Sequence, residues 1–245
     1  MNSPTMRLIR AELTLLCRDP LVLTFVVAFP VVTMLIIGGA FGTAPDPAFD
    51  NTNPAHWYVA SYLTVVIGAI GLVMTPVHLA SYRERGVLRR FAVAGFPRWS
   101  FAVAELVTGL IMTVVACTLL LIVALPVYGL PPLHSAWRVL LALSIGAVCF
   151  VGIGVLLGSV LRSARSAQAV GLLLFFPSFL LGAGGPPPHV MGSAVRTVSG
   201  PLPLTLLTNA VREPWLGIGS ATTSLIALAG ITVLVTAVAA RRAVL

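Results

Sequence analysis

The sequence predicts an all-α, polytopic membrane protein that crosses the bilayer six times. Hydrophobic residues make up 58% of the 245-residue chain and charged residues only 9%, a balance too apolar for a soluble globule. Six apolar runs each approach or exceed the roughly 20 residues that a helix needs to cross the hydrocarbon core. Because backbone groups in hydrocarbon must bond within their own segment, we expect helices rather than strands.

The six predicted spans are separated by connections that hold most of the prolines and charges. They cover residues 21–41, 58–80, 101–128, 138–161, 167–183 and 216–240. Arg7, Arg10 and Arg18, which precede the first span, also suit the start of a secretory signal peptide. Residues 21–41 are longer than the roughly 7 to 15 apolar residues of such a signal, so we expect an uncleaved span.

The distribution of arginines predicts the orientation of the chain. All 15 positively charged residues are arginines, and an N-terminus inside the cell leaves only Arg138, Arg196 and Arg212 outside. Short loops rich in arginine face the cytoplasm. We therefore expect a multi-pass protein of the plasma (inner) membrane with both termini in the cytoplasm.

Two further segments are expected to lie at the membrane surface without spanning it. Residues 5–19 place arginines on one helical face and leucines on the other, which predicts an interfacial helix; the alternative is a charged flank without fixed structure. Residues 184–215 are proline-rich yet apolar, which predicts re-entrant helices near residues 191–197 and 204–212. A surface linker is the alternative for this outer segment.

Few residues suggest chemistry. The sequence has no lysine and no glycine-rich phosphate loop, so we expect no cofactor in this chain and ATP bound only by a partner subunit. His78, Ser81 and Glu105 would suit an intramembrane enzyme if they met in a wet pocket, but we expect interfacial polar residues at helix ends. The spacing of the three cysteines and four histidines predicts neither a metal site nor haem ligation.

The connection 81–100, with the sequence SYRERGVLRRFAVAGFPRWS, holds five arginines, with Phe91, Phe96 and Trp99 interleaved among the charges. A loop needed only for topology does not require aromatic residues, whereas protein contact sites favour aromatic and arginine side chains. The composition therefore favours a cytoplasmic docking element over a plain positive loop.

At this point the chain resembles the permease subunits of ABC-2 type ABC transporters, a family that includes bacterial drug, polysaccharide and lipid exporters. The likeness rests on the interfacial helix before six spans and on three stretches of residues. They are Arg83, Glu84, Arg85, Gly86 and Leu88 after the second span, then Phe176, Pro177, Leu180, Gly182 and Pro186, then Pro201, Leu202, Pro203, Leu204 and Thr205. Val87, Glu105 and the run Gly184 to Pro188 depart from the family pattern.

The resemblance implies a transport subunit that is not itself an enzyme. Two permease subunits, identical or related, would pair in the lipid, and two ABC ATPase subunits would dock below them, with no role for nucleic acid. The first, second and fifth spans would line the path. Coupling to the ATPase would fall to Arg83, Glu84, Arg85, Gly86, Leu88, Phe91 and Phe96, and the outer gate to Phe176, Pro177, Gly182, Pro186 and Pro203.

For the cargo, mostly apolar spans favour a hydrophobic or amphipathic compound such as a drug or antibiotic. A lipid-linked glycan, a lipid or a haem-related compound remains an alternative cargo, and aromatic residues stacked along the path would favour the glycan. The intramembrane enzyme remains the alternative from a different class.

Overall fold

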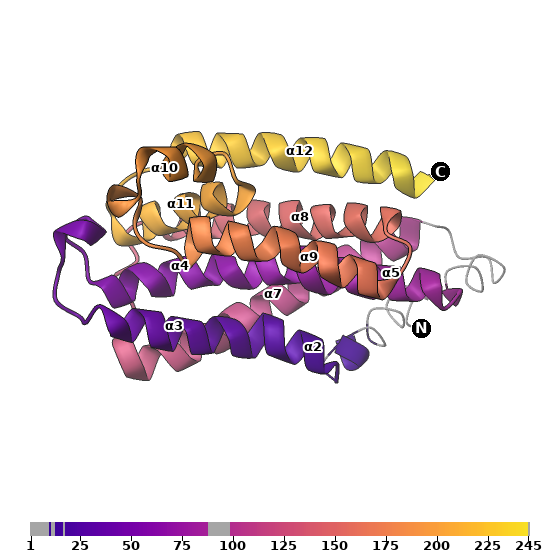
Figure 1. The fold of residues 1–245 in the computed structure, drawn as a ribbon, viewed down its shortest axis with the longest axis horizontal. Helices are drawn as coiled ribbons and strands as arrows, with labels where there is room; N and C mark the ends of the chain where they lie inside the picture. The colour runs from indigo at the N-terminus through magenta and orange to yellow at the C-terminus, as the bar shows by residue number, and fades with distance from the viewer. Residues whose placement is uncertain (1–9, 11–12, 17, 88–98, 245) are drawn as a thin grey trace.

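The computed structural model describes residues 10, 13–16, 18–87 and 99–244. Long helices lie side by side in one elongated bundle (Figure 1). In the described residues no strand forms, and the β interaction found there is a single bridge between Asp46 and Thr52. The all-α fold class predicted from the sequence is therefore confirmed.

Within the described residues, six helices are long and apolar enough to cross a membrane. The structure builds them, in chain order, from α2 (Pro20–Val22), η1 (Leu23–Ala28) and α3 (Phe29–Ala40); α4 (Pro54–Ala69), η3 (Ile70–Met74) and α5 (Thr75–Glu84); α7 (Trp99–Tyr128); α8 (Ala136–Val160); α9 (Ala164–Ser178) and η4 (Phe179–Ala183); and α12 (Thr222–Val244). The six-span prediction is thus confirmed for the described part of the chain.

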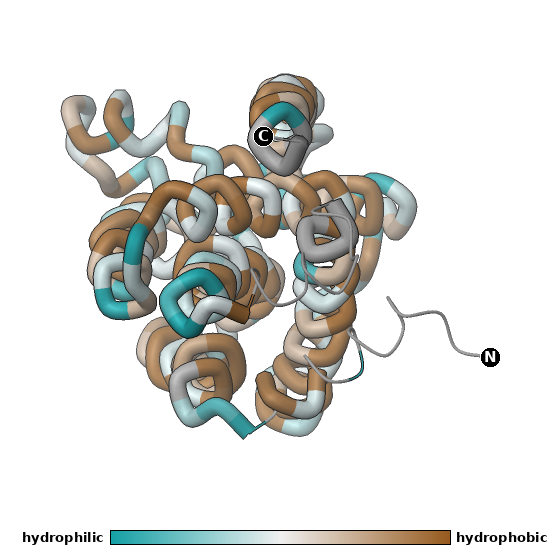
Figure 2. The backbone as a smooth tube through the Cα atoms, turned by 90° about the vertical axis from the view of Figure 1, so that its right-hand side faces the viewer, coloured by the Kyte–Doolittle hydropathy of each residue, from teal (hydrophilic) through white to brown (hydrophobic). Residues whose placement is uncertain are grey.

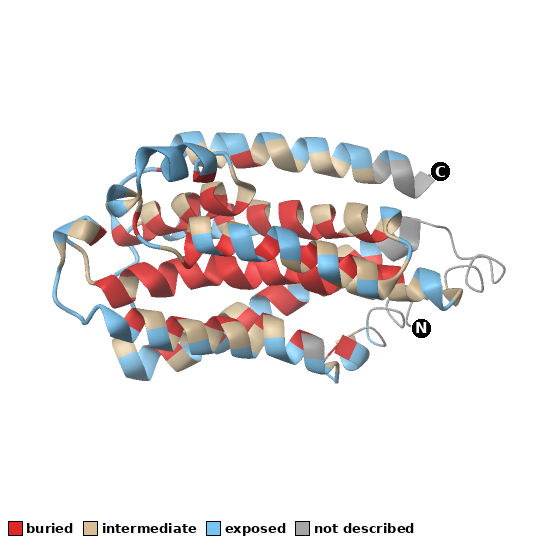
Figure 3. Cartoon of the chain, in the orientation of Figure 1, coloured by how far each residue is buried: buried red, intermediate tan, exposed pale blue. Residues whose placement is uncertain are grey.

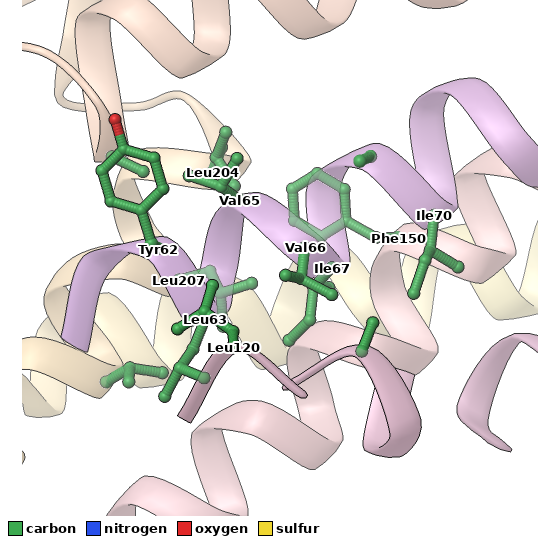
Figure 4. Close-up of a cluster of buried hydrophobic side chains, with 14 of the residues drawn as sticks. Tyr62, Leu63, Val65, Val66, Ile67, Ile70, Leu120, Phe150, Leu204 and Leu207 are labelled. Atoms are coloured by element: carbon green, nitrogen blue, oxygen red, sulfur yellow. The ribbon is translucent and has the colours of Figure 1, made fainter. Parts of the chain in front are cut away.

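The second span is the centre of the bundle. Its most apolar window is 89% buried, whereas the corresponding windows of the other five spans are 11% to 50% buried. Figure 3 shows this helix as a continuous buried column between partly exposed neighbours. Side chains from α4, α7, α8 and α11 meet around it, including Tyr62, Leu120, Phe150 and Leu207 (Figure 4).

Glycines let neighbouring backbones approach the second span closely. A methyl group on Gly154 of α8 would overlap the carbonyl oxygen of Gly71, and one on Gly171 of α9 would overlap the carbonyl oxygen of Leu72. Small residues permit such approach between helices in lipid, where no hydrophobic force drives helices together. The fourth and fifth spans are consequently held against the same π-helical turn, η3.

Wide π-helical turns occur in the first, second and fifth spans, and each has a proline nearby. Pro30 follows η1, Pro76 follows η3, and Pro177 precedes η4. A proline inside a helix lacks an amide hydrogen, and its ring clashes with the carbonyl four residues earlier. For Pro30 and Pro76, the wider turn that precedes the proline relieves this clash. The three spans that carry these turns are those that the resemblance assigns to the path.

The segment between the fifth and sixth spans folds into short helices. η5 (Pro188–Val190) and α10 (Ser193–Ser199) are largely exposed, while α11 (Pro203–Leu216) is mostly buried against α4 and α8. Gly217, with a φ of 74°, ends α11, so the sixth span starts at Thr222, later than the predicted start at Leu216. Membrane re-entry by these helices stays a prediction.

The two ends of the bundle differ in charge. The end of α5, the α8–α9 connection and the end of α12 lie together, at the right of Figure 1. Exposed arginines at this end are Arg83, Arg85, Arg162, Arg165 and Arg241. Figure 2 faces this end and shows hydrophilic residues at the helix ends, with mostly hydrophobic turns along the helices behind them.

Candidate functional site

Arg83 joins the end of the second span to the end of the fourth. Its Nη1 donates hydrogen bonds to the carbonyl oxygens of Gly158 at 3.2 Å, Leu161 at 3.3 Å and Ser159. These carbonyls belong to the last turn of α8, where the helix has no further amides to bond and its dipole is negative. Arg83 thus serves as a cationic cap supplied by another helix.

Glu84, the next residue, contacts the start of the fifth span. Its Oε2 accepts a hydrogen bond from the backbone amide of Ala164, the first residue of α9, at 3.0 Å. Ser163 and Ser166 also form a capping box at this helix start, so the sequence begins α9 here without help from α5. A carboxylate at a helix N-terminus is favoured by the helix dipole.

Arg83 and Glu84 therefore place opposite charges on the two helix ends that flank one connection. Of the other predicted coupling residues, Arg85 is exposed, and Gly86 has a φ of 67° that favours glycine. Leu88, Phe91 and Phe96 lie outside the described residues, as does most of the predicted interfacial helix 5–19. The contact of α5 with the α8–α9 connection is the part of the predicted coupling element that lies in the described residues.

His78 and Glu105 form a second polar contact between spans. His78 Nδ1 lies 2.8 Å from Glu105 Oε1, and Glu105 is only 1% exposed. Glu105, near the start of α7, is turned inward toward α5, and its location at the membrane interface stays a prediction. Ser81 donates its hydroxyl hydrogen to the backbone oxygen of His78 at 2.7 Å. The serine hydroxyl and His78 Nδ1, the groups needed for a catalytic pair, are thus each bonded elsewhere.

Aromatic rings connect the first, second and fifth spans. Phe29 lies at the centre, with its ring centroid 5.3 Å from that of Phe179, and 5.9 Å from those of both Phe175 and Phe176. Phe179 contacts Tyr62 of the second span at 6.0 Å. Most of these pairs are edge-to-face, an arrangement that favours a defined packing of the three spans.

The series of rings continues toward the end opposite the exposed arginines. Tyr62 contacts Tyr58 at 6.2 Å, Tyr58 contacts Phe49 at 5.8 Å, and Phe49 contacts Trp57 at 5.8 Å. Phe49 comes from the connection between the first two spans and is 2% exposed. That connection is therefore anchored in the bundle rather than extended into solvent.

The predicted outer-gate residues fall at two levels. Phe176 and Pro177 lie within α9, about six residues or roughly 9 Å along the helix from Gly182. Gly182 packs against Thr205 of α11, close to Pro203 at the start of that helix, and Pro186 is exposed in the following turn. The structure therefore groups Gly182 with the α11 start and places Phe176 with Phe25 and Phe29 of the first span.

Several contacts at the end opposite the exposed arginines could not be predicted from the sequence. Tyr58 donates a hydrogen bond to the Gly185 carbonyl at 3.3 Å, and His189 lies 2.9 Å from Asp50. Arg212 stacks on Trp57, its guanidinium carbon 3.8 Å from the ring centroid. Arg212 is one of two arginines in the segment 184–215, and nothing in the sequence distinguishes it from Arg196. These contacts join the outer segment to the second span and to the first connection.

In the described part of the chain, no three histidine, cysteine, aspartate or glutamate side chains gather as metal ligands do. The side chains described above instead join helices: Arg83 and Glu84 at one end of the bundle, Phe29 and its partner phenylalanines along the bundle, and Arg212 at the other end.

Comparison with known proteins identifies relatives among transporters. The chain is 25% identical over 162 residues to the probable multidrug ABC transporter permease YbhR of Escherichia coli (strain K12). The aligned region covers 65% of this chain and 44% of that protein. It is 24% identical over 134 residues to the probable multidrug ABC transporter permease YbhS of the same strain, covering 53% of this chain and 36% of that one. The chain thus matches less than half the length of these relatives.

The family described as "ABC-2 type transporter" matches residues 5–215. This range includes the first five spans, the contacts of Arg83 and Glu84 with the α8–α9 connection, and nearly all of α11. With six apolar spans, the protein is a multi-pass membrane protein, and the chain belongs to the ABC-2 type transporter family.

Proposed function

We propose that this chain is the permease subunit of an ATP-driven exporter that moves a hydrophobic or amphipathic compound out across the plasma membrane. ATP is bound and hydrolysed by a pair of separate ABC ATPase subunits, and a second permease subunit completes the pathway. Both termini and the arginine-rich end face the cytoplasm, because short arginine-rich loops are retained there.

The contact of Arg83 and Glu84 with the α8–α9 connection carries this proposal. A movement of the docking element 81–100 is passed to the end of α5, and from there through charge-assisted hydrogen bonds to the start of α9. The fifth span then carries the movement to the phenylalanines that it shares with the first span. In these terms ATP stabilises one of two arrangements of the bundle, and the permease is the two-state element.

The ring series supports a cargo with apolar or aromatic surface. Phe176 is 37% exposed on the face formed by the first and fifth spans, beside partly exposed Phe25. These rings offer a drug-like or lipid-like molecule an apolar contact. Because rings also stack on sugars, the same series supports a lipid-linked glycan as the second candidate cargo.

Reconstitution with a partner tests the proposal. The chain is co-expressed with an ABC ATPase encoded beside it, and the purified complex is placed in vesicles. We expect ATP hydrolysis that hydrophobic or amphipathic compounds stimulate, and ATP-dependent uptake of those compounds into inside-out vesicles. A complex that hydrolyses ATP without moving any of them, or a chain that does not bind an ATPase, contradicts the proposal.

A further inference from the structure

Arg212 of α11 is a buried cation whose direct side-chain contacts are an amide oxygen and an aromatic ring. The side chain is 4% exposed, its Nη2 donates a hydrogen bond to Asn209 Oδ1 at 2.8 Å, and its guanidinium carbon lies 3.8 Å from the Trp57 ring centroid. Its Nε is buried with no hydrogen-bond partner in the described part of the chain. An unpartnered buried nitrogen on a charged group is rare, because the group has lost its water without a replacement.

The nearest carboxylates are bonded to other groups. Glu213 Oε2 accepts from the Ala221 amide at 3.0 Å, and Asp50 Oδ1 lies 2.9 Å from His189 Nε2. Among the described residues, neither forms an ion pair with Arg212 within 4.0 Å. Burial lowers the pKa of Arg212 to about 10, while the negative charges of Glu213 and Asp50 act to raise it. The guanidinium therefore still carries its charge at neutral pH.

A cation–π contact and one amide oxygen compensate a buried guanidinium only in part. The planar fork of arginine matches the oxygens of phosphate and carboxylate groups, which bind it through paired, charge-assisted hydrogen bonds. Trp57, the ring beneath Arg212, also ends the ring series that runs through Phe49, Tyr58 and Tyr62. A group suited to binding anions thus lies directly beside a series of aromatic rings that are buried in this arrangement of the bundle.

We propose that Arg212 binds the phosphate or carboxylate head of an amphipathic cargo, whose apolar part follows the rings that begin at Trp57. The head group replaces the Asn209 oxygen and engages Nε as the bundle opens at this end. This inference rests on the proposed export function and narrows its cargo to anionic amphiphiles.

The test compares head groups on one alkyl chain. The full chain is purified into phosphatidylcholine nanodiscs, and binding of dodecyl phosphate, dodecyl phosphocholine and inorganic phosphate is titrated. We expect dodecyl phosphate to bind about tenfold more tightly than dodecyl phosphocholine, because the choline group places a positive charge next to the phosphate that Arg212 would bind. We expect inorganic phosphate to bind far more weakly, because it lacks the apolar chain.

Variants locate the preference at one side chain. Arg212→Gln should remove the preference for dodecyl phosphate, and Arg212→Lys should keep part of it, because the charge stays while the planar fork is lost. Arg196→Gln, which removes an exposed arginine from α10 at the same end of the bundle, should leave it unchanged.

Equal binding of the two dodecyl compounds by the unaltered protein overturns the inference, and this comparison stands even if Arg212→Gln does not fold. A preference that survives in a folded Arg212→Gln variant also overturns it, as does inorganic phosphate that binds as tightly as dodecyl phosphate. If the preference depends on Arg212 but no amphiphile stimulates the complex with its ATPase, the anion site stands and the proposed export function fails.

Discussion

The Glu84 carboxylate accepts a hydrogen bond from the Ala164 amide at 3.0 Å, although the two residues are 80 positions apart in the chain. The last residue of the second span is thereby bonded to the first residue of the fifth. Both residues lie at the arginine-rich end, and Glu84 belongs to the predicted docking element 81–100. The contact gives that element a direct route into a span assigned to the path.

Replacement of Glu84 should weaken coupling more than folding. Glu84→Gln removes the negative charge from the α9 N-terminus, an interaction that contributes about 0.3 to 1 kcal/mol at an exposed helix end. Because Ser163 and Ser166 still cap α9, membrane abundance should stay normal while cargo-stimulated ATP hydrolysis falls. Asp46→Asn is the matched control, since Asp46 also accepts from a backbone amide, that of Ala48, far from this end. Equal ATPase stimulation in the two variants would contradict the role of Glu84.

Arg83→Lys should reduce transport although it keeps the positive charge. One guanidinium nitrogen reaches three carbonyl oxygens at the end of α8, and the compact ammonium group of lysine does not reproduce this planar geometry. Transport per molecule of ATP, measured in vesicles, should fall below that of Arg85→Lys, which changes an exposed neighbour. Identical transport in both variants would show that charge alone is sufficient.

Gly171→Ala should destabilise the bundle. The added methyl overlaps the Leu72 carbonyl oxygen, a backbone atom that cannot move without shifting η3, and overpacking of this kind costs about 1 to 3 kcal/mol. The melting temperature in detergent should drop for Gly171→Ala and stay unchanged for Gly230→Ala, since no atom lies within 4 Å of a methyl group placed at Gly230. A Gly171→Ala variant as stable as the control would disprove the close approach of α9 to η3.

Phe29→Leu should loosen the contact between the first and fifth spans. Phe29 forms three ring pairs with span-five phenylalanines, and each aromatic pair contributes about 0.5 to 1.5 kcal/mol beyond its buried area. We expect a changed cargo profile in ATPase stimulation, with the largest loss for aromatic compounds. Trp137→Leu, at an exposed ring on α8, is the control and should behave like the unaltered protein.

Cysteine labelling should establish the orientation. In a variant without native cysteines, Thr43→Cys lies in the exposed connection after α3, and Arg162→Cys lies in the α8–α9 connection at the arginine-rich end. A membrane-impermeant thiol reagent added to intact cells should label the first and spare the second. The opposite pattern would reverse the assigned topology and place the Arg83–Glu84 contact outside the cell.

Much of the fold could be predicted from the sequence, because the lipid bilayer restricts the length and the secondary structure of the segments that cross it. The length of each apolar run predicts a span, and helices are required where no water can satisfy the backbone. Gly154 and Gly158 are four positions apart, a spacing that favours close packing of helices in lipid. The sequence does not indicate that Gly154 packs against the Gly71 carbonyl. Helices in lipid associate by the fit of their shapes, because a neighbouring helix is no more apolar than the lipid around it.

The candidate site was harder to predict for the same reason. The segment 83–86 stood out by composition and family pattern, yet the partners of Arg83 and Glu84 are backbone groups, which every residue carries alike. The docking aromatics Phe91 and Phe96 stay predictions. Phe176 and Gly182 were grouped in one gate, although their separation along α9 and η4 puts them at different levels of the bundle.

The sequence by itself determined that this protein lies in a membrane, that it has six spans, and which end of the bundle carries the arginines, because hydropathy and charge act locally along the chain. Only the tertiary structure decided that the second span is central, that Glu84 meets Ala164, and that Arg212 stacks on Trp57 without an acidic partner among the described residues. These relationships join residues 80 or more positions apart, and they depend on which helix faces meet. Apolar side chains that face lipid and those that face another helix are alike in hydropathy, so packing alone distinguishes them.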